Sequence, residues 1–195
     1  LTLNEVGLIS LAKKLLRLIV GFSDSVITVL MPKVSRSEIY QINSDIPKIT
    51  SILFFFSIIF ITLYLSFLEG IIKIIYGNDF IGIVKFSIPL ALVTIFLPFG
   101  NILLTTITHT GDPIKKFYSR AIGFVFNLLA YYPLFLFYGA FGFVVSIAVG
   151  QFIIFLTSLF FFKRKFDGIR LYKLFIIEIN DIKYLFKILK KQISK

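Results

Sequence analysis

The chain has 195 residues, of which 57% are hydrophobic and only 16% charged, and its formal net charge is +11. Soluble domains usually carry about 45–50% apolar and about 25% charged residues, so this composition excludes an ordinary soluble fold and indicates a membrane protein. Cysteine is absent, which excludes disulfide frameworks and Cys-based zinc sites.

The apolar residues are gathered in runs long enough to cross a membrane. A hydrocarbon core about 30 Å thick needs roughly 20 apolar residues in helical conformation. Five segments have this length, at about residues 7–30, 49–68, 86–107, 121–138 and 141–162. Residues 1–162 are therefore predicted to form an all-α integral membrane bundle of about five transmembrane helices. Residue 1 is not Met and no basic leader follows it, so no signal peptide is expected and the chain is expected to begin inside a longer protein.

The first segment differs from the others because it carries charges on one face. At 100° per residue, Lys13, Arg17 and Asp24 lie within about 40° of one another on a helix. The charged stripe comprises Ser10, Lys13, Lys14, Arg17, Asp24 and Thr28. Each ionised group at the bilayer centre costs roughly 2.5–3.5 kcal/mol on insertion scales, so the stripe is expected to face a bundle interior or a hydrated cavity. Its cations suit a phosphate-bearing ligand. An interfacial amphipathic helix and a purely structural ion network remain alternatives.

The later segments contain prolines, small residues and isolated polar side chains. Pro89, Pro98 and Pro133 predict either static kinks or hinges. A turn is predicted around Gly139, between the fourth and fifth segments. The polar residues include Asn101, Asn127 and Gln151. They are expected to hydrogen-bond neighbouring helices or to line a cavity and contact a hydroxyl-rich substrate.

The basic residues predict the orientation of the chain. Sixteen of the 21 Lys and Arg residues fall in 31–48, 110–120 and 163–195. The positive-inside rule places these segments, and therefore the C-terminus, in the cytoplasm. Residues 163–195 are predicted to be a basic cytoplasmic tail, with an amphipathic helix from Ile182 onward that lies on the anionic inner leaflet. A nucleic-acid partner is not expected, because the basic residues do not gather on a polar domain.

Catalytic signatures are missing from the sequence. It contains no phosphate-binding Gly-Lys-Ser/Thr loop, no Gly-x-Ser-x-Gly elbow and no His-Glu-x-x-His zinc motif. His109 stands alone, without partner ligands for a metal. The chain is therefore predicted not to be an enzyme, and no cofactor or metal is expected.

Five short motifs follow one another in a characteristic order. They are VGLISLAKKL at 6–15, VLMPKVS at 29–35, IIKIIYGNDF at 71–80, TGDP at 110–113 and GAFG at 139–142. Together they resemble the carboxy-terminal half of a polysaccharide flippase of the Wzx type, in the MOP exporter superfamily. The resemblance implies half of a MATE-like two-bundle transporter, with an amino-terminal half missing from this chain.

The same resemblance implies a function in the bacterial cytoplasmic (inner) membrane. Such flippases translocate oligosaccharide repeat units linked to polyprenyl pyrophosphate, for O-antigen, capsule or other surface polysaccharides. Lys13, Lys14, Arg17 and Asp24 would then lie on the substrate path and bind the anionic headgroup. Possible lining residues of the polar cavity are Ser10, Thr28, Asn101, Asn127 and Gln151.

Other functions predict different features. A multidrug or cation exporter of the same superfamily should have acidic residues dominating its cavity. A membrane glycosyltransferase or polymerase of the same pathway should have a large outside loop with convergent acids, whereas residues 69–85 are short and nearly balanced in charge. An anchoring subunit without a transport role should lack a hydrated cavity.

Overall fold

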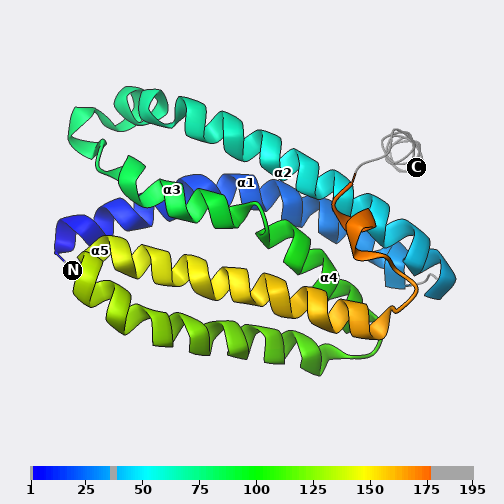
Figure 1. Ribbon diagram of the computed structural model, residues 1–195. Coiled ribbons are helices and arrows are strands. Elements are labelled where there is room, and N and C mark those ends of the chain that lie inside the picture. Colours follow the sequence, from blue (N-terminus) through cyan, green and yellow to red (C-terminus); the bar gives the residue numbers. More distant parts are fainter. Residues whose placement is uncertain (1, 36–38, 177–195) are drawn as a thin grey trace.

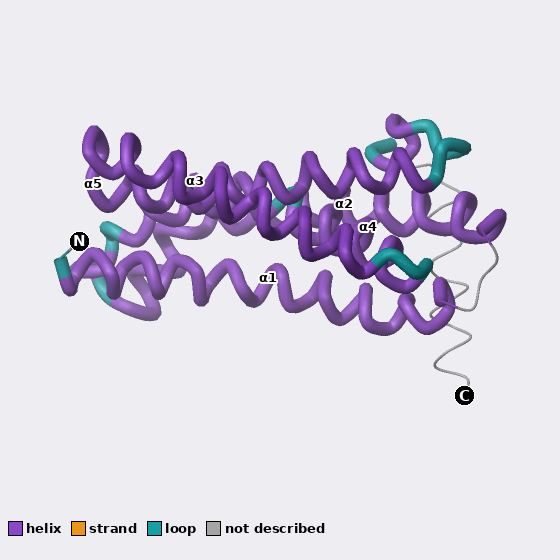
Figure 2. The backbone as a smooth tube through the Cα atoms, turned by 90° about the horizontal axis from the view of Figure 1, so that it is seen from below, coloured by secondary structure: helices purple, strands orange, loops and turns teal. Residues whose placement is uncertain are grey.

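The computed structural model describes residues 2–35 and 39–176, and this part of the chain contains helices and no strands. The all-α prediction is thus confirmed for the described residues. The long helices run side by side in alternating directions (Figure 1), and a view turned by 90° shows α1 along one side of the bundle (Figure 2). The elements are α1 (Leu3–Ser35), α2 (Ile39–Tyr76), η1 (Asn78–Phe80), α3 (Ile83–Thr94), α4 (Leu97–His109), α5 (Pro113–Lys165) and η2 (Leu171–Leu174).

Three helical regions in the described part of the chain are long and apolar enough to cross a membrane. They are Ile42–Tyr76, Ile83–His109 and Pro113–Lys165, with 35, 27 and 53 residues. Four of the five predicted spans lie inside these regions. The fifth predicted span, residues 7–30, lies within α1. This helix has 33 residues but is not one of the three helical regions that are apolar enough to cross a membrane. The architecture is compatible with a multi-pass membrane protein, and five crossings require that α1 also crosses.

Two breaks divide the long apolar regions. The backbone of Gly139 is non-helical, with φ 56° and ψ −134°, in the left-handed half of conformational space that glycine adopts without steric cost. It separates α5 into a first arm (residues 113–138) and a second arm (140–165), which fold back as a hairpin (Figure 1). The turn predicted at Gly139 is therefore present. The second break lies between α3 and α4, where Pro98 occupies the first turn of α4.

The helices extend further than the apolar segments predict. The connection expected over residues 31–48 is mostly helical, because α1 continues to Ser35 and α2 begins at Ile39. Hydropathy locates only the part of a helix that lipid can solvate, so it does not show where a helix projects beyond the membrane. Pro47 lies inside α2 and was not expected within a helix. Pro89 and Pro133 lie inside α3 and α5, and neither ends its helix.

Charge is distributed unequally between the two ends of the bundle. At one end, called here the basic end, α1 ends, α2 begins and α4 is joined to α5 (Figure 1). Its described cations include Lys115, Lys116, Arg120, Lys163, Arg164 and Lys165. The opposite end has Lys73 and Lys85 beside acidic residues, and Lys73 is paired with Glu69 at 2.7 Å. This asymmetry matches the predicted pattern of basic connections.

The predicted tail begins with a segment that packs into the bundle. Phe166, Ile169 and Leu174 are buried after the end of α5, and they join the hydrophobic cluster that includes Phe99 and Phe162. The amphipathic helix expected from Ile182 lies outside the described residues. The first part of the tail was predicted only as part of a basic cytoplasmic tail, and its role in the core was missed because the segment is short and interrupted by charges.

The two arms of α5 are held close together by glycine. A Cβ atom at Gly150 would lie 2.8 Å from Asn127 Cβ and 2.9 Å from the Gly123 carbonyl oxygen, so both backbones would have to separate. Gly150→Ala is therefore expected to lower the free energy of unfolding by about 1–3 kcal/mol, as other overpacking substitutions do. Thermal unfolding of the purified protein in detergent measures this change.

A matched control exists on α2. A Cβ atom at Gly70 would have nothing within 4 Å, and the residue is exposed on a helix. Gly70→Ala is expected to leave stability unchanged or raise it by up to about 1 kcal/mol. Equal effects of the two substitutions would contradict the close packing of the α5 arms.

Candidate functional site

The charged stripe lies on the exposed face of α1. All six residues of the stripe, Ser10, Lys13, Lys14, Arg17, Asp24 and Thr28, are exposed. The opposite face is apolar, and Ile9, Ala12, Leu16 and Ile27 are buried on it. Helix α1 packs against α3 and α4 through this side. The periodicity of the sequence therefore divides α1 into a packed apolar face and an exposed charged face.

The cations of the stripe are not neutralised within the described part of the chain. Lys13 Nζ lies 5.8 Å from the centre of the Phe143 ring, a cation–π contact with the second arm of α5. Neither Lys14 nor Arg17 forms an ion pair with another described residue. The structural ion network that the sequence left open is thus not formed among the described residues. Three cationic side chains remain available to an anionic ligand.

A cavity with both polar and apolar lining residues lies between α4 and the two arms of α5. Its volume is about 510 Å³. Asn101 of α4, Asn127 of the first arm and Gln151 of the second arm all line it, together with Arg120. The structure therefore brings together the three carboxamides that the sequence analysis named as possible cavity residues.

Arg120 was not among the predicted site residues. Arg120 was expected in the basic connection over residues 110–120, whereas it belongs to α5 and lines the cavity. A spacing of seven residues places Arg120 and Asn127 on the same face of one helix, about 10 Å apart along its axis. This spacing is the signal in the sequence that could have identified Arg120.

One hydrogen bond connects the stripe with the cavity. Asn101 Nδ2 donates to Asp24 Oδ1 at 3.5 Å, between α4 and α1. Thr28 Oγ1 donates to the Asp24 carbonyl oxygen at 2.8 Å, so this hydroxyl is used within its own helix. Lys13 is about 16 Å from Asp24 along the axis of α1. The predicted residues thus form two neighbouring groups: a cationic group on α1, and a carboxamide group that Asp24 contacts.

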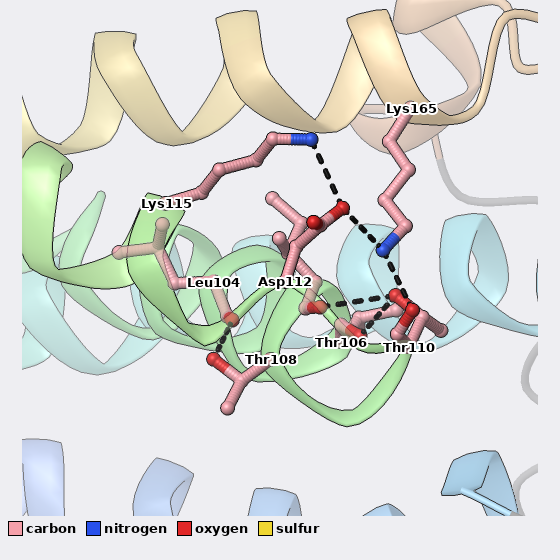
Figure 3. A network of polar contacts seen from close by, with 8 residues as sticks. Leu104, Thr106, Thr108, Thr110, Asp112, Lys115 and Lys165 are labelled. Carbon is pink, nitrogen blue, oxygen red and sulfur yellow. Dashed lines mark hydrogen bonds and ion pairs between the residues drawn. The ribbon is translucent and has the colours of Figure 1, made fainter.

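A third polar group closes the basic end of the bundle (Figure 3). Lys165 Nζ donates to Asp112 Oδ2 at 2.6 Å and to the Thr110 carbonyl oxygen at 2.7 Å. Lys115 Nζ donates to the same Asp112 oxygen at 3.0 Å. Asp112 belongs to the TGDP turn, in which Gly111 has a φ of 97°. These contacts tie the turn between α4 and α5 to the far end of α5.

The two lysines change the acidity of Asp112. Hydrogen bonds from Lys165 first, and then from Lys115, hold the pKa of the Asp112 carboxyl below its ordinary value of 3.8. A carboxyl whose pKa is lower in the folded than in the unfolded state stabilises the fold at pH values above its ordinary pKa. This contribution is lost as the pH falls through the lowered pKa.

Replacement of Asp112 tests this network. Asp112→Asn is expected to lower the unfolding temperature by a few degrees at neutral pH, because Asn cannot pair with two ammonium groups. The difference from the unchanged protein should disappear at a pH below the lowered pKa of Asp112. Unfolding temperatures measured across pH 2–7 check both expectations. Asp79→Asn, at the opposite end of the bundle, is the control, and an equal effect there would contradict a specific role for Asp112.

The described residues contain no group of three or more His, Cys, Asp or Glu side chains that could hold a metal ion. The all-helical fold of the described residues and the three long apolar helices are compatible with a multi-pass membrane protein. Comparison of the chain with models of protein families, with curated proteins and with solved structures gives no match.

Proposed function

We propose that this chain is the carboxy-terminal part of a flippase that moves lipid-linked oligosaccharides across the bacterial cytoplasmic membrane. The observation that carries the proposal is the exposed cationic group on α1, formed by Lys13, Lys14 and Arg17, which forms no ion pair with any other described residue. Ionised side chains within membrane helices face a bundle interior or a water-filled path rather than lipid. A second helical bundle on this side of α1 would enclose such a path. Helix α1 would then cross the membrane in addition to the four other predicted spans.

The chemistry of the cationic group suits a pyrophosphate. Arg17 offers a planar fork of N–H donors that matches two phosphate oxygens, and Lys13 and Lys14 add compact charges one turn away. The polyprenyl chain of such a substrate is apolar and can remain in the lipid while its headgroup crosses. The ordered motifs that resemble polysaccharide flippases support the same substrate. The basic end would be cytoplasmic, in agreement with the positive-inside rule.

The alternatives fit the described residues less well. In a cation exporter the acids should dominate, whereas Asp24 is accompanied by three cations on the charged stripe of α1. In a glycosyltransferase or polymerase, convergent acids are needed at the outer connection. There Glu69 is paired with Lys73, and Asp79 lies in the separate element η1.

The proposal is tested in cells of the source bacterium. Deletion of the gene is expected to abolish the surface polysaccharide and to leave lipid-linked oligosaccharide on the inner leaflet, and the intact gene should restore export. Reading the frame upstream of Leu1 gives an independent test, because about six or seven further apolar spans are expected there by resemblance to two-bundle transporters. Unchanged polysaccharide after deletion, in cells that carry no second transporter of this kind, would overturn the proposal.

A further inference from the structure

We propose that the cavity between α4 and the two arms of α5 binds a carboxylated sugar ring of the uronic acid type. Arg120 takes the carboxylate, and the carboxamides of Asn101, Asn127 and Gln151 take the ring hydroxyls. The inference rests on the proposed function and adds to it a second contact with the same substrate, separate from the cationic group on α1.

The cavity has the size and walls of a ligand site. Its volume of about 510 Å³ lies within the range of roughly 300–1,000 Å³ that small-molecule pockets occupy. Phe96, Phe124 and Phe155 supply apolar walls. Gly123 and Gly150 also line it, so the backbones of the two arms meet there without side chains between them.

The polar groups in the cavity have unused hydrogen-bonding capacity. No hydrogen bond joins the side chain of Asn127 or Gln151 to another described residue, and Arg120 forms no ion pair within the described part of the chain. Each carboxamide has two N–H donors and one acceptor oxygen, which is the combination that ring hydroxyls require. Polar groups in membrane helices that find no partner in the protein are costly unless water or a ligand satisfies them. A hydroxyl-rich ligand supplies the missing partners.

The charge of the cavity indicates a carboxylate. Arg120 is the cation that lines it, and a single guanidinium balances one negative charge. A carboxylate carries one charge, and its two oxygens match the guanidinium fork. The apolar walls can cover the C–H faces of a sugar ring, while the carboxamides reach its edge.

The position of the cavity fits a substrate that extends from the stripe. The hydrogen bond between Asn101 and Asp24 links the cavity to α1, and Asp24 is about 10 Å from Arg17 along that helix. A pyrophosphate held by Lys13 and Arg17 can therefore lie on the same molecule as a sugar held near Asn101. The two groups would bind different parts of one lipid-linked oligosaccharide.

The test measures binding of free sugars to the full chain in lipid nanodiscs. Saturation-transfer NMR is used with glucuronate, glucose and glucose 6-phosphate as probes. Glucuronate is expected to bind more tightly than the other two. Arg120→Gln should weaken glucuronate binding about tenfold or more and leave glucose binding unchanged, because only the charge-assisted hydrogen bonds are removed. Asn127→Ala should weaken both glucuronate and glucose.

The matched control is Arg164→Gln, which removes the same charge from an exposed position near the end of α5. It should leave all three affinities unchanged, and the unfolding temperatures of the variants show whether each one folds. Equal binding of glucose and glucuronate, or an unchanged glucuronate affinity in Arg120→Gln, would overturn the inference. A preference for glucose 6-phosphate would also overturn it and assign the cavity to a phosphate ligand.

A second titration separates this inference from the proposed function. The unchanged protein is titrated with polyprenyl pyrophosphate that carries no sugar. Binding of this lipid without binding of glucuronate overturns the cavity inference and leaves the flippase proposal intact. Binding of glucuronate without binding of the lipid overturns the proposal that the protein is a flippase for a polyprenyl pyrophosphate substrate. The cavity then remains a site for a carboxylated sugar.

Discussion

Replacing both Lys13 and Arg17 by Ala is expected to weaken binding of polyprenyl pyrophosphate at least about a hundredfold and to abolish export of the surface polysaccharide. Hydrogen bonds to charged groups contribute about 1.5–3 kcal/mol each, so the loss of two such partners amounts to about 3–6 kcal/mol. Each 1.4 kcal/mol corresponds to a tenfold change in affinity. Both side chains are exposed, so their removal leaves the buried face of α1 unchanged, and the packing contact that is lost is that of Lys13 with the Phe143 ring. Lipid binding in nanodiscs and polysaccharide at the cell surface are the two measurements.

The matched control for this pair is Lys163→Ala with Arg164→Ala, which removes one lysine and one arginine from exposed positions near the end of α5. This control should retain lipid binding and export. The conservative pair Lys13→Arg with Arg17→Lys should bind the lipid much better than the double Ala variant. Both positive charges are kept, and the guanidinium group is moved from position 17 to position 13. Unchanged export in the double Ala variant, with normal amounts of folded protein, would show that the cationic group of α1 is not on the substrate path.

Much of the fold follows from the sequence because lipid solvation is a strong and simple constraint. Apolar runs of the required length located the helices that became α2, the pair α3 and α4, and the two arms of α5. Gly139 marked the hairpin because glycine alone adopts its backbone conformation without steric cost. Pro98 was predicted, like Pro89 and Pro133, to give a kink or a hinge, and of the three it lies at a break, in the first turn of α4, where the helix needs no donor from the proline nitrogen. The extensions of α1 and α2 into 31–48 were missed, because this stretch contains several charged and polar residues and so gives no continuous apolar run.

The candidate site was predictable only in part. Asn101, Asn127 and Gln151 were noticed because polar residues are rare in apolar spans, and the structure places all three at one cavity. Their association depends on the rotation of three helix segments about their axes, which hydropathy does not determine. Arg120 was assigned to a loop because its charge suggested the membrane surface. The contact between Asp112 and Lys165 joins residues 53 positions apart in sequence, and no local pattern indicates it.

The segment after α5 contributes to the core through stacked aromatic rings. The Phe175 ring lies 4.8 Å from the Phe99 ring at an interplanar angle of 21°, and 5.3 Å from the Phe54 ring. Phe99 is completely buried and also contacts Phe155 at 5.2 Å. The segment therefore joins α2, α4 and the second arm of α5 at the basic end. A tail that only lay on the membrane surface would make no such contacts.

Removal of the Phe99 ring is expected to destabilise the protein more than any other substitution considered for this chain. Phe99→Ala should lower the free energy of unfolding by about 3–5 kcal/mol, because it leaves a cavity at a fully buried position. Phe175→Ala should cost less, because that side chain is partly exposed. The double variant should lose less than the sum of the two, by a coupling of about 0.5–1.5 kcal/mol for a stacked aromatic pair. Unfolding by added denaturing detergent measures all three variants.

Phe67→Ala on the exposed side of α2 is the control, and it should have little effect. Strict additivity of Phe99→Ala and Phe175→Ala would mean that the segment after α5 does not pack on α4 in the membrane. A measurable coupling would instead make residues 166–176 part of the transmembrane bundle, so that a truncation after α5 removes part of its core.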